Sequence, residues 1–173
     1  MNKKIFKTNN SNRKIRVLTF ILSKVTALMI VIIIIINMII FVPPIFGYQV
    51  FDVISGSMEP VIKVNSLIYV QETKPQDLVA GDIITYTSNK GIITHRVVTN
   101  NSNAQEIITK GDNNLQVDLQ PIAYRNIIGK VFFTIPYLGY YVSFISSLFG
   151  KVLVIIIVVF CFIIREIVKW YFK

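Results

Sequence analysis

Two long apolar runs, one toward each end, limit what this 173-residue chain can fold into. The first covers residues 17–42, and its only charge is Lys24, so that residues 25–42 carry none. About 20 apolar residues in a helix cross the hydrocarbon core of a bilayer. Pro43 and Pro44 follow, and proline ends a helix because it has no N–H to donate. The sequence therefore predicts a transmembrane helix over residues 17–42.

A cleaved secretory signal peptide is the alternative for this first run. Its apolar part is longer than the roughly 7–15 residues of such a peptide. The residues that follow it, Pro-Pro-Ile-Phe-Gly, contain no small-x-small cleavage site. We therefore expect an uncleaved membrane anchor.

The second apolar run covers residues 141–164 and is less clear-cut. Its densest part, residues 152–164, is too short to span a bilayer alone. Extending the run toward residue 145 gives a full span but includes Lys151, whose long side chain can reach the interface. Trp170 and Tyr171 beyond the run fit an aromatic belt. We expect a second transmembrane helix, and an interfacial or partner-paired helix remains the alternative.

Basic residues are concentrated beside the two runs, in an arm of residues 1–16 and a tail of residues 165–173. Lysine and arginine near membrane spans stay on the cytoplasmic side, so both termini should be cytoplasmic. Residues 43–140 should then form an extracytoplasmic domain of a multi-pass cell-membrane protein. The net charge of +9 thus reflects contact with the lipid bilayer. No basic stripe or recognition motif predicts a nucleic-acid partner.

The chain has one cysteine, Cys161, and one histidine, His95. No disulfide can form within the chain, and no cysteine–histidine zinc motif is present. Cys161 lies inside the second apolar run, where a small packing residue is the expected role and a lipidated or reactive thiol the alternative. The sequence predicts neither a metal nor a cofactor.

The segment between the runs has the pattern of a mainly β domain. Short runs rich in β-branched and aromatic residues alternate with Gly, Asn and Ser turns, which is typical of a barrel-like or folded sheet. A helical segment is expected only around residues 75–79. The expected strands are residues 67–70, 82–86, 92–99, 106–109 and 127–135. The predicted fold class is a small β-sheet catalytic domain flanked by two transmembrane helices.

Three segments of this domain carry residues suited to catalysis. Ser57 lies in Ser-Gly-Ser-Met-Glu-Pro just after the first run, a segment whose composition also suits a plain loop. A hydroxyl nucleophile needs a base, and His95 is the sole histidine, although a lone histidine is more often structural. Asp112, in the turn-like Gly-Asp-Asn-Asn, and Asp118 are both candidates to orient the imidazole. Spacing does not decide between them.

Four short motifs occur in a fixed order: Ser-Gly-Ser-Met-Glu-Pro, Gly-Asp-Ile, Thr-His-Arg-Val and Thr-Lys-Gly-Asp-Asn-Asn. Together they resemble signal peptidase I, in the branch found in archaea, the endoplasmic reticulum and some spore-forming Gram-positive bacteria. The resemblance covers roughly residues 48–139. It implies a serine endopeptidase that removes signal peptides from exported preproteins, in which histidine replaces the lysine base of the usual bacterial enzymes.

The resemblance also implies individual roles. Ser57 corresponds to the nucleophile and His95 to the general base. Asp118 corresponds to the third triad member of the endoplasmic-reticulum relatives and is the favoured partner of His95, with Asp112 as support; Asp112 corresponds to an acid that some bacterial members use as the partner, so both remain candidates. Ser55 corresponds to a hydroxyl that joins the Ser57 backbone N–H in the oxyanion hole. An extended substrate would pair with the strand that contains Asp52, Val53 and Ile54.

Two other functional classes compete with a peptidase. A non-catalytic membrane-anchored β module, such as an assembly or scaffolding protein on the same fold, would tolerate changes at Ser57 and His95. A small channel or transporter subunit is a weaker alternative, because few ionisable groups lie within the runs.

Overall fold

The computed structural model describes the backbone of residues 3–171. It describes the side chains of residues 13, 16–168 and 170. It has two compact units: the first is residues 1–39 with 147–173, and the second is residues 40–146. The sequence-based boundaries of the central domain, 43–140, differ from this by a few residues at each end. Several basic residues invoked for the topology lie outside the described side chains, namely Lys3, Lys4, Lys7, Lys14, Lys169 and Lys173.

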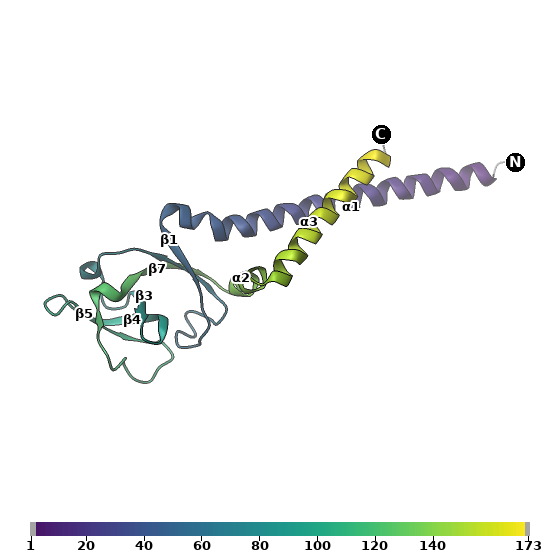
Figure 1. Cartoon of the computed structure of the whole chain (residues 1–173). Helices are drawn as coiled ribbons and strands as arrows, with labels where there is room; N and C mark the ends of the chain where they lie inside the picture. The colour runs from purple at the N-terminus through teal and green to yellow at the C-terminus, as the bar shows by residue number, and fades with distance from the viewer. Residues whose placement is uncertain (1–2, 172–173) are drawn as a thin grey trace. The chain divides into compact units, whose positions relative to one another are not determined.

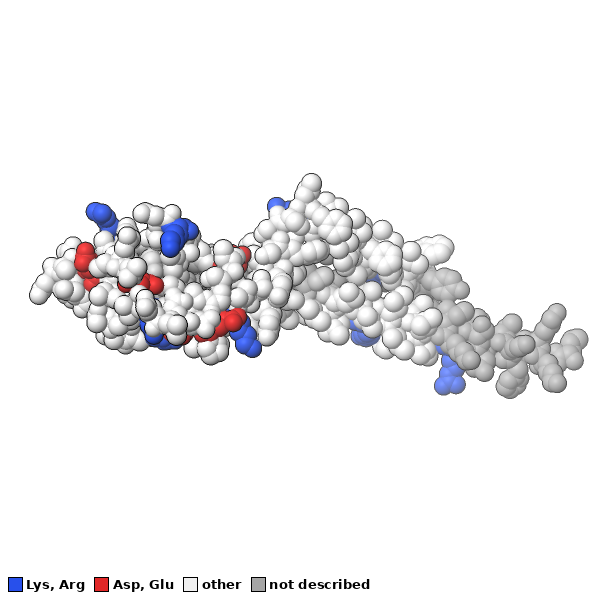
Figure 2. Space-filling model, turned by 90° about the horizontal axis from the view of Figure 1, so that it is seen from below, with Lys and Arg blue, Asp and Glu red and all other residues white. Residues whose placement is uncertain are grey.

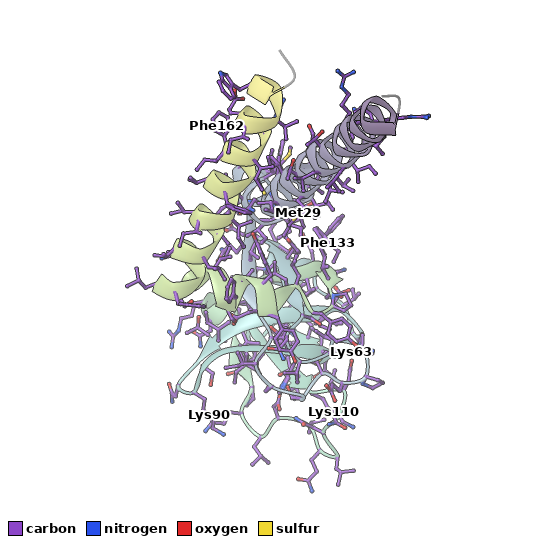
Figure 3. The ribbon with its side chains drawn as sticks, turned by 90° about the vertical axis from the view of Figure 1, so that its right-hand side faces the viewer. Met29, Lys63, Lys90, Lys110, Phe133 and Phe162 are labelled. Carbon is purple, nitrogen blue, oxygen red and sulfur yellow. The ribbon has the colours of Figure 1, made fainter. Side chains whose placement is uncertain are left out.

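The first unit contains the two long helices, α1 (Lys3–Phe41) and α3 (Leu148–Tyr171). Helix α1 continues through the basic arm rather than beginning at residue 17. Residues 16–46 and 148–168 are long and apolar enough to cross a membrane. Apolar side chains, among them Met29 and Phe162, are exposed along both helices (Figure 3). A helix surface this apolar requires a non-aqueous environment, which supports membrane localisation.

The second apolar run differs from the single helix over residues 141–164 that the sequence predicted. The structure has two helices there, α2 (Leu138–Ser146) and α3, which are separated at Ser147. The Ser147 hydroxyl accepts a hydrogen bond from the Gly150 N–H, as a serine preceding a helix commonly does. Lys151 therefore lies in the first turn of α3 rather than within a span that begins at residue 141. Cys161 is a buried residue of α3.

The second unit is built on one seven-stranded antiparallel sheet, which curves strongly (Figure 1). The strand order is β1-β2-β7-β3-β4-β5-β6. This confirms the predicted mainly β domain between two helices. The strands are β1 (Tyr48–Asp52), β2 (Leu67–Gln71), β3 (Ile83–Ser88), β4 (Gly91–Asn101), β5 (Glu106–Lys110), β6 (Ile122–Ala123) and β7 (Ile127–Ile135).

Three short 3-10 helices connect these elements: η1 (Pro43–Phe46) after α1, η2 (Pro75–Asp77) before β3, and η3 (Tyr124–Asn126) before β7. The helical segment expected around residues 75–79 is the single turn η2. Prolines occupy the first turn of both η1 and η2, where a missing N–H costs no hydrogen bond.

Two hydrophobic clusters stabilise the domain. One contains Ile84, Tyr86, Val97 and Ile107 from neighbouring strands β3, β4 and β5. The other contains Met58, Ile62, Ile68 and Val70, and so packs the segment after β1 onto β2. Strand β2 is central to this packing, because four of its five residues are buried. The second cluster fixes the loop that carries Ser57.

Candidate active site

Strand register brings the site together on one face of the sheet. His95 on β4 is the partner of Ile84 on β3, and Val97 is the partner of Thr109 on β5. Alternate residues of a strand point to the same face. Tyr86, His95 and Thr109 therefore project from three adjacent strands onto one face.

The Ser57 loop reaches this face because it is anchored on both sides. Before it, the pairing of β1 with β2 continues beyond Asp52 through main-chain bonds from Val53 N to Ser66 O and from Asn65 N to Val53 O. After it, Met58 is 2% exposed within the hydrophobic cluster. The nucleophile candidate thus lies between a paired strand end and a buried side chain.

His95 contacts both Ser57 and Asp118. His95 Nε2 lies 3.2 Å from Ser57 Oγ, and His95 Nδ1 lies 2.6 Å from Asp118 Oδ2. An ionised carboxylate only accepts hydrogen bonds, so the imidazole carries its proton on Nδ1 and Nε2 is free to accept one from the serine. His95 is only 7% exposed. This is the arrangement by which serine hydrolases activate a hydroxyl.

The carboxylate of Asp112 binds Arg96 rather than His95. Arg96 donates two hydrogen bonds to its carboxylate, from Nε at 2.8 Å and from Nη2 at 2.6 Å, and a third from Nη1 to the Gly81 carbonyl at 2.7 Å. The hydrogen bonds to Asp112 raise the pKa of the Arg96 guanidinium. Of the two acids that the sequence left open, Asp118 therefore contacts His95, whereas Asp112 fastens its turn to β4.

That turn is docked against the Ser57 loop. Asn113 N donates to Ser57 O at 2.9 Å, and Asn113 Nδ2 donates to Gly56 O at 3.2 Å. The approach is so close that a Cβ at Gly111 would meet Ser57 O at 2.7 Å. Glycine is required at this position because no larger residue fits.

The other predicted site residues lie beside Ser57. The hydroxyl oxygens of Ser55 and Ser57 are 3.4 Å apart. Asp52 is the last residue of β1, whereas Val53 and Ile54 follow the strand rather than lying within it. Ile54 is 85% exposed. Strand β1 is the first of the sheet, and within the described backbone it pairs with β2 alone, so that its other edge is open there.

Besides Asn113, the side chains of Tyr86, Arg96 and Thr109 contact site residues and were not identified from the sequence. Thr109 Oγ1 donates to Asp118 Oδ2 at 2.5 Å, and the Tyr86 hydroxyl lies 3.4 Å from the same oxygen. Burial, together with the nearby charge of Asp118, raises the pKa of Tyr86 to about 12. Arg96 and Thr109 lie within the quoted motifs, but their side-chain partners follow only from the sheet register.

A histidine that contacts a serine and an aspartate on an antiparallel β domain is the arrangement of a serine hydrolase, and the flanking apolar helices are those of a membrane-associated one. Comparison with known proteins narrows this class. Over 89 residues the chain is 39% identical to signal peptidase I W of Bacillus subtilis, which covers 49% of this chain and 47% of that protein. Over 107 residues it is 34% identical to the signal peptidase complex catalytic subunit SEC11 of Fusarium vanettenii, covering 55% of this chain and 62% of that protein.

The corresponding subunit of Candida albicans is 36% identical over 107 residues, covering 55% of this chain and 64% of that protein. The chain thus spans about half the length of the bacterial relative and less than two thirds of the fungal ones. No protein-family model matches it. These relatives confirm the predicted resemblance to the signal peptidase I family, in its endoplasmic-reticulum-like type.

Proposed function

We propose that this chain is a membrane-bound signal peptidase I, a serine endopeptidase that removes signal peptides from exported preproteins. The observation that carries the proposal is the contact of His95 with both Ser57 and Asp118, at 3.2 and 2.6 Å. The names of the relatives favour this peptidase over other serine hydrolases.

The reaction proceeds in two steps. Ser57 Oγ attacks the scissile carbonyl carbon while His95 Nε2 takes the hydroxyl proton. When the C–N bond breaks, His95 returns that proton to the leaving amine, and an ester of Ser57 remains. His95 then deprotonates a water that attacks the ester, and it returns this proton to Ser57 Oγ as the acyl–oxygen bond breaks and the carboxylic acid product leaves. Asp118 stabilises the imidazolium that forms in each step.

Ser55 and the Ser57 backbone N–H supply the oxyanion hole in this proposal. The two serine hydroxyls are 3.4 Å apart, so an oxyanion that forms at the attacked carbonyl would lie within reach of Ser55 Oγ. Donors aimed at the developing charge usually provide the largest single catalytic effect.

The preprotein would bind as an extended strand along the open edge of β1, next to Asp52, Val53 and Ile54. Main-chain hydrogen bonds at such an edge give affinity without requiring one sequence. The membrane anchors keep enzyme and substrate at the same surface, which raises their effective concentration.

Both termini are cytoplasmic and the β domain is extracytoplasmic in this proposal. The domain of residues 40–146 has seven basic and eight acidic residues, whereas the remaining segments have eleven basic residues and one acidic. Figure 2 illustrates the mixed charges of the domain. A cysteine introduced at Ser102, an exposed residue in the turn between β4 and β5, should react with a membrane-impermeant reagent in intact cells. Labelling only after lysis would refute this orientation.

The competing function is a non-catalytic, membrane-anchored β module. The full-length protein, reconstituted in lipid with a model preprotein, distinguishes the two. The unmodified protein should release the signal peptide, and the Ser57→Ala variant should not, while remaining folded and inserted. Equal processing by both proteins, or by neither, would refute the peptidase proposal.

A further inference from the structure

The carboxylate of Asp118 is held by more than the imidazole. Its Oδ2 atom accepts hydrogen bonds from His95 Nδ1 at 2.6 Å and from Thr109 Oγ1 at 2.5 Å. The hydroxyl of Tyr86 lies 3.4 Å from this oxygen and 3.3 Å from Thr109 Oγ1. Asp118 lies on a loop between β5 and β6, so no strand of its own fixes its side chain.

Both hydroxyl residues are rigidly placed by the sheet. Thr109 on β5 is 0% exposed, and Tyr86 on β3 is buried in a hydrophobic cluster. The Asp118 N–H donates to the Thr109 carbonyl at 2.8 Å, so Thr109 holds both the main chain and the side chain of Asp118. The ring of Tyr86 meets the imidazole of His95 edge-on, with centroids 6.4 Å apart.

We propose that Thr109 and Tyr86 are positioning residues, which hold Asp118 Oδ2 against His95 Nδ1 and so keep Nε2 directed at Ser57. The inference rests on the proposed peptidase function. It assigns a role to two residues that touch neither Ser57 nor, in the proposed mode, the substrate.

The direction of each hydrogen bond supports this role. A carboxylate has no proton to donate, so the Thr109 hydroxyl donates to Asp118 and keeps a lone pair for Tyr86. Because its pKa is about 12, Tyr86 stays protonated and remains a donor throughout the physiological range. Hydrogen bonds linked in this way strengthen one another in a poorly solvated site. Because Thr109 makes the shorter hydrogen bond to Asp118, loss of its hydroxyl should lower kcat more than loss of the Tyr86 hydroxyl.

The test uses full-length variants in lipid. Thr109→Val keeps the shape of the side chain but removes the hydroxyl, and it should lower kcat about 10–100-fold, the cost of one hydrogen bond to a charged group. KM should change less than about twofold, because binding contacts are retained. Thr109→Ser restores the hydroxyl and should recover most of kcat. Tyr86→Phe should lower kcat about 3–10-fold.

A matched control is available one residue from Tyr86. Thr85 is also fully buried, and its hydroxyl lies 2.9 Å from that of Thr94, but it points to the opposite face of the same strands. Thr85→Val therefore removes one hydroxyl of a partly buried hydrogen-bonded pair without touching Asp118, and it should keep the unmodified kcat. A loss in Thr85→Val equal to that in Thr109→Val would mean that general destabilisation is the cause, and would overturn the proposal.

A second readout is independent of cleavage. Because the chain has one histidine, the imidazole NMR signals of an untagged sample belong to His95. The Nδ1 proton that faces Asp118 should resonate far downfield, and it should shift in Thr109→Val but not in Thr85→Val. An unchanged signal in Thr109→Val, or an unchanged kcat, overturns the inference and leaves the proposed function standing. Absence of cleavage by the unmodified protein refutes the proposed function. In that case the NMR shift by itself tests whether Thr109 holds Asp118 against His95.

Discussion

The main-chain N–H of Asn113 donates a hydrogen bond to the carbonyl oxygen of Ser57 at 2.9 Å. This bond joins two segments that are 56 residues apart in the sequence and places the turn of residues 111–114 directly behind the candidate nucleophile. Arg96 holds the same turn through Asp112. The position of Ser57 therefore depends on groups that do not themselves face His95.

The two acids near the site should differ in their effects. Asp118→Asn retains the shape but removes the charge and presents the wrong hydrogen-bonding group to His95, so kcat should fall about 10³–10⁴-fold. Asp112→Asn weakens only the attachment of the turn, and the loss should be on the order of tenfold. Single-turnover cleavage of a preprotein measures both. A larger loss in Asp112→Asn than in Asp118→Asn would reverse the assignment.

Gly111→Ala should damage both stability and activity. The added Cβ would meet Ser57 O at 2.7 Å, so the two loops must separate. Overpacking of this kind costs about 1–3 kcal/mol. Gly56→Ala is the comparison for stability, because its Cβ would meet Glu59 at an ordinary 3.5 Å. Gly111→Ala should therefore melt at a lower temperature than Gly56→Ala. A Gly111→Ala protein as stable as the unmodified one would contradict the close approach.

Ser55→Ala tests the oxyanion hole. Loss of one donor to the developing negative charge should lower kcat by about 10²–10³. KM should stay near the unmodified value, because the donor acts mainly in the transition state. Steady-state kinetics with a signal-peptide substrate provide both parameters. An unchanged kcat would assign the oxyanion contact to other donors.

The buried phenol of Tyr86 predicts a loss of stability in alkali. Its pKa is raised by burial from 10.0 to about 12, so from about pH 10 the unfolded chain releases this proton while the folded domain retains it. The stabilisation is fully present below pH 10 and is lost as the pH rises toward 12. Burial also raises the pKa of Tyr69, which acts in the same direction. Urea unfolding of the β domain at about pH 9 and about pH 11, followed by circular dichroism, should show a smaller difference in Tyr86→Phe than in the unmodified protein.

Much of the β domain could be predicted because its strands are short, β-branched and separated by clear turns. The strand over residues 127–135 has the predicted bounds. Strands β3 and β4 differ from prediction by one or two residues at each end, and β5 by one residue at its C-terminal end. Strand β6 was missed because two residues carry no periodicity. The break at Ser147 was missed because Ile145 and Leu148 on either side are as apolar as a continuous helix would require.

The candidate site, too, could be predicted from the sequence only in part. Motif order alone was enough to name Ser57, His95 and two acids. It could not distinguish Asp112 from Asp118, because both follow β5 within eight residues and the choice depends on which of them Arg96 engages. Thr109 and Tyr86 could not be identified from the sequence, because their contact with Asp118 depends on how strands β3, β4 and β5 pair.

The account depends on Ser57 and His95 acting as one unit. The most direct measurement is the residual cleavage rate of Ser57→Ala, His95→Ala and the double variant, all reconstituted at full length. Residues that act together lose their effect together, so each single variant and the double variant should show nearly the same large loss. Losses that multiply in the double variant, or a single variant with the unmodified rate, would contradict the account.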